Sequence, residues 1–190
     1  MPKRTIRDLE LDGRRLFVRV DFNVPLREGV IDDDTRIRAA LPTLRLALER
    51  GATLVVGSHL GRPKGAANPA LSLLPIGERL SELLDLPVAF APDAVGDPVA
   101  AALTEAGPGG VVLLENLRFH AGEEANDPAF ANALAAPCDA YVNDAFGAAH
   151  RAHASTVGVA GRVADAAAGL LMVEELEHPG ARLASPPRPF

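Results

Sequence analysis

The sequence contains very little cysteine and no long apolar run. Cys138 is its only cysteine, so the chain can form no internal disulfide. No segment reaches the roughly 18 apolar residues of a membrane span, and the charged start MPKRTIRDLELDG gives no signal peptide. We therefore expect a cytoplasmic protein without a membrane partner. Cys138 lies in an apolar run, and we interpret it as a small packing residue rather than a nucleophile.

Three well-known ligand motifs are also missing. A P-loop requires G-x-x-x-x-G-K-[ST], but GSHLGRPKG (57–65) has a different spacing, and Lys64 is followed by Gly65. No G-x-G-x-x-G occurs, which removes the dinucleotide fingerprint, and no G-x-S-x-G occurs, which removes the serine nucleophile elbow. We therefore expect no nucleotide cofactor site in this chain.

Positive charge is in the minority. The formal net charge of −6 argues against a general affinity for nucleic acid. The hydrophobic share of 48% is enough to bury the core of one ordinary domain of 190 residues, or of one domain with a tail. Against this acidic average, a local cluster of arginine and histidine becomes more informative.

Short β-rich runs alternate with Ala/Leu-rich helical runs along the chain. Strands are predicted at 15–20, 53–57, 86–90, 111–115 and 139–144, with a possible short sixth strand at 156–160. Helices are predicted at 35–50, 74–84, 97–106, 128–136 and 164–178. This alternation predicts an α/β fold: a three-layer, Rossmann-like, doubly wound and mostly parallel sheet of about six strands.

Turn and cap residues sharpen some of these boundaries. Pro42 lies inside the first predicted helix, so a kink or a split is expected there, and Gly51 should end that helix. Asp127 followed by Pro128 indicates the start of the helix at 128–136. The segment 21–34, rich in Pro, Gly and Asp, is predicted to be a loop.

Polar side chains follow four of the predicted strands. In open α/β sheets, ligands bind at the carboxyl ends of the strands. The residues found there are Asp21, Asn23 and Arg36; His59 and Arg62; Asn116 and Arg118; and Asn143, Asp144, His150 and Arg151. Arginine suits carboxylate and phosphate oxygens, and Asp and Asn suit hydroxyl groups. The set therefore suits a small hydroxylated phospho-acid with two anionic ends.

Other interpretations of these residues remain open. Any one arginine alone is more simply a solvated surface residue or an ion-pair partner. His150 and His153 have the spacing of a metal pair on a helix, but no third ligand is evident and the nearby arginines disfavour a cation. Asn143 and Asp144 could hold a metal or act as a base, and they could equally order their own loop.

Five motifs in the sequence resemble those of a known family. They are RVDFNVPL (19–26), DDTRIRAALPTL (33–44), SHLGRPKG (58–65), ENLRFHAGEEANDPAFA (115–131) and YVNDAFGAAHRAHASTVG (141–158). In their order and spacing they resemble phosphoglycerate kinase, across nearly the whole chain. The resemblance covers only the amino-terminal half of that enzyme, whose carboxyl-terminal half binds Mg-ADP or Mg-ATP.

The resemblance implies roles for seven residues. Asp21 and Asn23 resemble the residues that hydrogen-bond the hydroxyl and carboxylate of 3-phosphoglycerate. Arg36 resembles the catalytic arginine beside the carboxylate that receives the phosphoryl group. The basic set that grips the 3-phosphate corresponds to His59, Arg62, Arg118 and Arg151. No family role corresponds to His150, and Lys64 is the residue of its loop least expected to touch ligand.

The resemblance also implies a domain layout. Residues 1–165 should form the 3-phosphoglycerate domain, and residues 166–190 an interdomain helix and linker, with the nucleotide-binding domain absent. We expect a chain that binds 3-phosphoglycerate without turnover, has no metal site, is monomeric, and pairs with the carboxyl-terminal domain of the same enzyme. The alternative is a stand-alone, non-catalytic domain that binds a phospho-acid.

Overall fold

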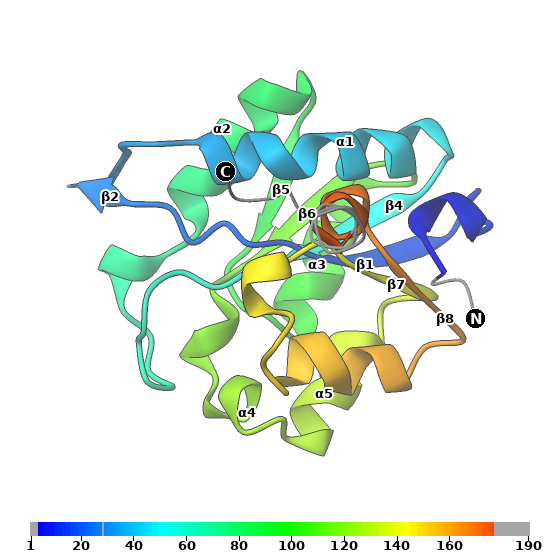
Figure 1. Ribbon diagram of the computed structural model, residues 1–190. Helices are drawn as coiled ribbons and strands as arrows, with labels where there is room; N and C mark the ends of the chain where they lie inside the picture. Colours follow the sequence, from blue (N-terminus) through cyan, green and yellow to red (C-terminus); the bar gives the residue numbers. More distant parts are fainter. Residues whose placement is uncertain (1–3, 28, 177–190) are drawn as a thin grey trace, which may run out of the picture.

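A central parallel sheet organises the protein. The computed structural model describes residues 4–27 and 29–176, and within them six strands run parallel in the order β5-β6-β4-β1-β7-β8 (Figure 1). Their bounds are β1 (Arg15–Arg19), β4 (Thr53–Gly57), β5 (Val88–Ala91), β6 (Val111–Leu114), β7 (Ala140–Asn143) and β8 (Asp165–Ala168). The predicted α/β, doubly wound architecture is confirmed.

Helices cover both faces of the sheet, because each strand is apolar on both sides. Leu16 and Val18 pack with α1 (Thr35–Glu49) and α2 (Leu74–Leu84), which lie above the sheet in Figure 1. Phe17, pointing the other way, joins the core formed with α3 (Asp97–Ala106) and α5 (Pro128–Ala135). Both cores therefore press on β1, the strand at the centre of the molecule.

Short elements complete the described chain. They are the hairpin β2 (Leu26–Arg27) and β3 (Val30–Ile31), the one-turn helix α4 (Ala121–Glu124), the 3₁₀ turns η1 (Ile6–Asp8), η2 (Pro69–Leu71), η3 (Leu117–Phe119), η4 (Phe146–Ala148) and η6 (Val159–Gly161), and the π turn η5 (Ala154–Gly158). In the described part of the chain, no helix combines the length and apolar character needed to cross a membrane.

Two predicted elements near the carboxyl end are wrong. Residues 156–160 lie in η5 and η6, where the amides of Thr156, Val157 and Gly158 converge on the carbonyl of His153. The sixth strand is β8 instead, in a segment predicted to be helical, because the edge of β7 offers it a hydrogen-bonding partner. Pairing in the sheet thus overrides the helix propensity of alanine. Helix follows at residues 170–176, and 177–178 lie outside the described residues.

Some of the turn and cap residues mark helix boundaries as predicted. Gly51 has φ +80° directly after α1, and the side chain of Asp127 accepts a hydrogen bond from the amide of Phe130 at the start of α5. Helix α1 continues through Pro42, so of the two expected outcomes, a kink or a split, the helix is not split. The hairpin β2–β3 occupies a segment predicted to be a loop, because two-residue strands carry too little pattern to detect.

One buried amide joins two loops at the carboxyl edge of the sheet. The amide oxygen of Asn116 accepts from the backbone nitrogens of Leu60 (3.2 Å) and Arg118 (3.1 Å). Its amide nitrogen donates to the carbonyls of Leu60 (2.7 Å) and Leu71 (2.9 Å). A single side chain therefore fixes the loop after β4 to the loop after β6.

We expect Asn116→Ala to lower the free energy of unfolding by at least about 2 kcal/mol, because it leaves several buried backbone groups unpaired. Asn132→Ala is the matched control: Asn132 is exposed on α5 and its side chain accepts a solvent-exposed hydrogen bond, from Nε of Arg162, so its effect should stay within about 0.5 kcal/mol. Urea unfolding of both variants measures the difference. Equal losses in the two variants would contradict the role given to Asn116.

Candidate functional site

The polar side chains predicted to form a site gather at the carboxyl edge of the sheet. Four adjacent strands, β6, β4, β1 and β7, end at this edge, which lies on the left in Figure 1. Asp21 follows β1, His59 follows β4, Arg118 follows β6 and Arg151 follows β7. Because all four strands are parallel, residues from four distant parts of the sequence come together there.

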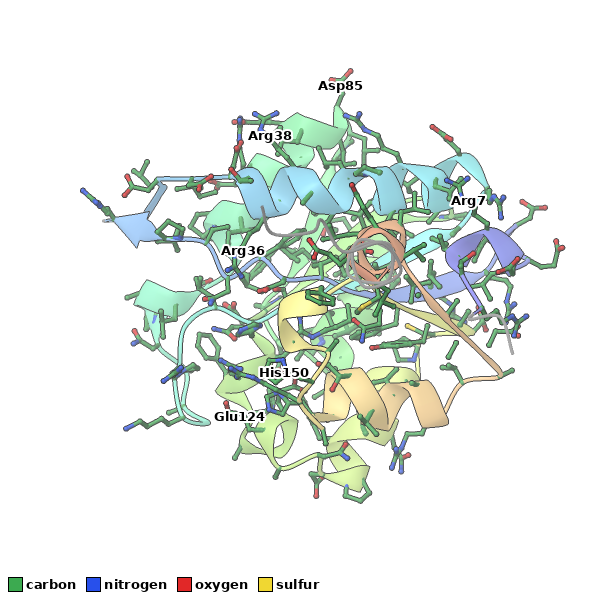
Figure 2. The ribbon with its side chains drawn as sticks, in the orientation of Figure 1. Arg7, Arg36, Arg38, Asp85, Glu124 and His150 are labelled. Atoms are coloured by element: carbon green, nitrogen blue, oxygen red, sulfur yellow. The ribbon has the colours of Figure 1, made fainter. Side chains whose placement is uncertain are left out.

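Asp21 and Arg36 form an ion pair on one side of this edge. A guanidinium nitrogen (Nη1) of Arg36 lies 2.7 Å from a carboxylate oxygen of Asp21, and Nδ1 of His59 lies 4.0 Å from the other. Figure 2 shows Arg36 below α1, toward the sheet, and Arg38 above it, where Arg38 pairs with Asp34. The two arginines of the same helix turn thus face different surroundings, and only Arg36 belongs to the cluster.

Gly61 is held from two directions by residues of the cluster. Its amide donates to the side-chain oxygen of Asn23 (2.9 Å), and its carbonyl accepts from Nη1 of Arg118 (2.8 Å). Gly61 has φ +61°, which strains any larger residue, and an added Cβ would also come within 2.8 Å of a terminal methyl group of Leu71. The following residue, Arg62, therefore projects from a fixed backbone, and its side chain is exposed.

Arg118 has spare hydrogen-bonding capacity although it is buried. Its exposed fraction is 3%, and within the part of the chain that the structure describes, Nε and Nη2 have no hydrogen-bond partner. Nε lies 3.4 Å from a carboxylate oxygen of Glu124, close enough for an ion pair but without hydrogen-bond geometry. Burial lowers the pKa of this guanidinium, and the positive charge of Arg151 lowers it further. Unpaired donors on a buried cation favour an anionic ligand.

His59 sits uncharged among these cations. Its exposed fraction is 6%, and burial lowers its pKa to about 2, helped by the charges of Arg19, Arg118 and Arg151. The imidazole is therefore neutral at pH 7 and can donate only one hydrogen bond at a time. Arg151 is thus close enough to act on the His59 ring through its charge.

Arg19 is a member of the cluster that the sequence analysis missed. It is fully buried, its Nε donates to Oγ of Ser155 (2.8 Å), and Nη2 lies 3.2 Å from Nδ1 of His59. Its position inside the strand pattern RLFVRV concealed it. The signal was present, because strand alternation puts Arg19 on the same buried face as Phe17, where a cation is unusual.

Arg151 and His150 lie at the end of the loop that follows β7. Arg151 is half-buried, its backbone carbonyl accepts from the hydroxyl of Thr156 (2.7 Å), and its Nε lies 3.5 Å from Nε2 of the exposed His150. His153 is buried, with Nδ1 3.8 Å from a carboxylate oxygen of Glu123, and burial lowers its pKa. The two histidines thus have different surroundings, unlike a metal pair.

Asn143 and Asp144 both order backbone through their side chains. The side-chain oxygen of Asn143 accepts from the amide of Ala145 (3.0 Å). Asp144 is buried, and one carboxylate oxygen accepts from the amides of Leu171 (3.0 Å) and Met172 (3.3 Å) at the start of the last described helix. Among residues 4–27 and 29–176, no group of three or more His, Cys, Asp or Glu side chains is arranged to hold a metal ion.

Two hollows differ in their relation to this cluster. A cavity of about 240 Å³ borders it and is lined by Asp21, Arg36 and Asp144 among others. A larger groove of about 730 Å³ lies at the opposite, amino edge of the strands, between α3 and the end of α5, and is mainly apolar. Asp21 and Arg36 connect the smaller hollow to the cluster, although it has less volume, and Arg118 lies outside its lining.

Cys138 lies away from both the cluster and its charges. It packs against the core that contains Phe17 and α5, which confirms it as a packing residue. Burial raises the pKa of its thiol to about 12, so the thiolate form is scarce at neutral pH.

The neutral state of His59 predicts a specific pH dependence. Its folded pKa lies below the unfolded value near 6.5, so as the pH falls below 6.5 only the unfolded chain takes up this proton and stability is lost. We expect His59→Gln to reduce the slope of unfolding free energy against pH between 6 and 4 by about 1.4 kcal/mol per pH unit. Parallel curves for wild type and His59→Gln would refute the neutral, buried state.

Comparison with known proteins gives a consistent result. The family model described as phosphoglycerate kinase matches residues 6–190. Phosphoglycerate kinase from Solibacter usitatus is 57% identical over 190 residues, which cover 97% of this chain and 48% of that protein. The corresponding protein from Rubrobacter xylanophilus is also 57% identical, over 100% of this chain and 48% of its own length. The chain therefore spans about half the length of the curated relatives it matches.

Solved structures agree with the sequence relatives. The phosphoglycerate kinase of Coxiella burnetii matches with a TM-score of 0.84 and 38% identity, over 99% of this chain and 47% of that chain. The enzyme from Pyrococcus horikoshii matches with a TM-score of 0.87 and 34% identity, over 97% and 47%. In sequence and in fold, this chain belongs to the phosphoglycerate kinase family.

Proposed function

We propose that the basic cluster binds 3-phosphoglycerate and that the chain is the acceptor-substrate half of a phosphoglycerate kinase. The observation that carries this proposal is buried Arg118, whose Nε and Nη2 have no hydrogen-bond partner in the described residues. A phosphate offers several acceptor oxygens and two negative charges, which match those donors and the neighbouring cations. Membership of the family supports the same assignment.

The proposed ligand has two anionic ends, and the cluster has two matching sides. His59, Arg62, Arg118 and Arg151 would grip the 3-phosphate. Asp21 and Asn23 would bind the hydroxyl and the carboxylate at the other end, next to Arg36. In this arrangement the 3-phosphate is the part that does not react, and its binding orients the carboxylate.

Arg36 is the residue for which we propose a catalytic role. Phosphoryl transfer depends mainly on in-line positioning and charge stabilisation. Arg36 is half exposed and pairs with Asp21 at 2.7 Å, so its guanidinium can turn to a carboxylate that carries an incoming phosphoryl group. Its charge would offset the negative charge that develops between the acceptor and the transferring group.

The nucleotide would bind outside the described residues. The chain lacks the P-loop, and residues 4–27 and 29–176 offer no cluster suited to a metal ion. We propose that Mg-ATP or Mg-ADP binds to a second, carboxyl-terminal domain, consistent with relatives twice as long as this chain. Residues 1–165 would then form the substrate domain and 166–190 the connection to the second domain, with closure of the two halves excluding water.

A second function fits the same cluster. The chain could act as a stand-alone domain that binds a phospho-acid without catalysis, because the binding residues are present while a nucleotide motif is absent. Binding of 3-phosphoglycerate is common to both proposals, and turnover separates them.

We expect the 190-residue chain to bind 3-phosphoglycerate in calorimetric titration and to show no binding of Mg-ATP. A coupled assay with both compounds should show no ATP-dependent turnover, because the nucleotide is proposed to bind outside these 190 residues. Tight binding of Mg-ATP to this chain would contradict the proposed division of roles. Failure to bind 3-phosphoglycerate would overturn both functions.

Arg62 and Lys64 offer a matched pair within one loop. Both side chains are exposed, and only Arg62 is proposed to contact the 3-phosphate. We expect Arg62→Ala to weaken binding of 3-phosphoglycerate by about 1–3 kcal/mol, as for a lost charge-assisted hydrogen bond. Lys64→Ala should change the dissociation constant little. Similar losses in both variants would indicate general attraction by charge and would remove Arg62 from the site.

A further inference from the structure

A buried chain of hydrogen bonds runs from α4 through η5 and β1 to the basic cluster. Its members are Glu123, Ser155, Arg19 and His59, and the exposed fraction of each is 6% or less. Arg19 and Ser155 are 136 positions apart in the sequence. Of the four residues, the sequence pointed only to His59 as a site residue. Buried polar chains of this kind hold their members in one arrangement when every bond is satisfied.

The chain begins at a fully buried carboxylate. One oxygen of Glu123 accepts from the backbone amide of Ser155 (3.0 Å), and the other accepts from its hydroxyl (2.5 Å). The hydroxyl has a single proton, which it donates in the hydrogen bond to Glu123. Oγ of Ser155 is therefore left as an acceptor, and Nε of Arg19 donates to it (2.8 Å).

The next link determines where the proton of His59 lies. Nη2 of Arg19 is 3.2 Å from Nδ1 of His59. A guanidinium can only donate, so Nδ1 must be the acceptor and must carry no proton. The ring proton is then on Nε2. A doubly protonated ring would place an N–H against the N–H of Arg19 and is disfavoured.

We propose that Glu123 and Ser155 position Arg19 so that it holds His59 as the neutral tautomer with its proton on Nε2. Ser155 and Glu123 act here as positioning residues, because they reach His59 only through Arg19. The consequence for ligand binding rests on the function proposed above. His59 would present one fixed N–H donor to an anion, and this donor would remain the same across the physiological pH range.

Other charged groups around His59 mostly act in the same direction. Asp21 favours a protonated ring, but its oxygen is 4.0 Å from Nδ1, farther than Arg19. The cations disfavour protonation, and burial adds to their effect. The titratable and charged groups that face the ring are Arg19, Asp21, Arg118, Arg151 and His153.

Nitrogen NMR of the histidine rings in the 190-residue chain, without ligand, tests the proposal directly. We expect the Nδ1 resonance of His59 to have the shift of an unprotonated nitrogen, and Nε2 that of a protonated one, unchanged from pH 5 to pH 8. A proton on Nδ1, or a titration of His59 with a midpoint near 6.5, would overturn the proposal. This measurement needs no variant and therefore does not depend on any substitution folding.

Ser155→Ala tests the positioning role. Without the hydroxyl, Nε of Arg19 loses its anchor, so the Nη2–Nδ1 contact should loosen and His59 should show a mixture of tautomers. Ser72→Ala is the matched control, because the hydroxyl of Ser72 also donates to a glutamate, Glu115 (2.7 Å), without contacting Arg19. It should leave the His59 resonances unchanged. A Ser155→Ala spectrum identical to wild type would contradict the positioning role.

The ligand is added only afterwards, so that the two proposals can fail separately. We expect Ser155→Ala to weaken 3-phosphoglycerate binding about 3- to 10-fold, as for one weakened hydrogen bond. If His59 has the Nε2–H tautomer and wild type does not bind 3-phosphoglycerate, the proposed function is wrong and the proton assignment stands. If wild type binds but His59 carries its proton on Nδ1, the assignment is wrong and the proposed function stands.

Discussion

The burial of cationic side chains at the carboxyl edge of the sheet is the constraint on which the rest of the site depends. Arg19 is fully buried and Arg118 nearly so, and burying an unpaired charge is costly. The protein meets this cost for Arg19 with Ser155, His59 and a backbone carbonyl. For Arg118 it does so incompletely, because two donor atoms have no hydrogen-bond partner in the described residues. A bound anion would supply the hydrogen-bond acceptors and the negative charge that Arg118 lacks.

The fold makes this concentration of charge possible. Four adjacent parallel strands end at one edge, and the loops that follow them all lie in the same small region. Rigid local devices then fix the loops: Asn116 ties the loops after β4 and β6 together, and Gly61 is held between Asn23 and Arg118. The buried cations Arg19 and Arg118 are therefore held by the scaffold before a ligand arrives, which limits the entropy lost on binding.

Much of this arrangement could be predicted from sequence, and the failures have physical causes. Five of the six strands and the charged strand ends were found because buried parallel strands are apolar and their loops are not. Strand β8 was missed because its alanines favour a helix when considered alone, and only pairing with β7 makes them a strand. Arg19 was missed although strand alternation places it on a buried face, whereas its partner Ser155 was missed because a hydrogen bond between residues 136 positions apart leaves no local pattern.

The central claim is that the unpaired donors of buried Arg118 belong to an anion site. The direct measurement is the Nε–H resonance of Arg118 in the NMR spectrum during titration with 3-phosphoglycerate, with the Nε–H of Arg15, at the opposite edge of the sheet, as reference. The account predicts a saturable shift at Arg118 and none at Arg15. An unchanged Arg118 resonance at saturating ligand, or equal shifts at both arginines, would contradict it.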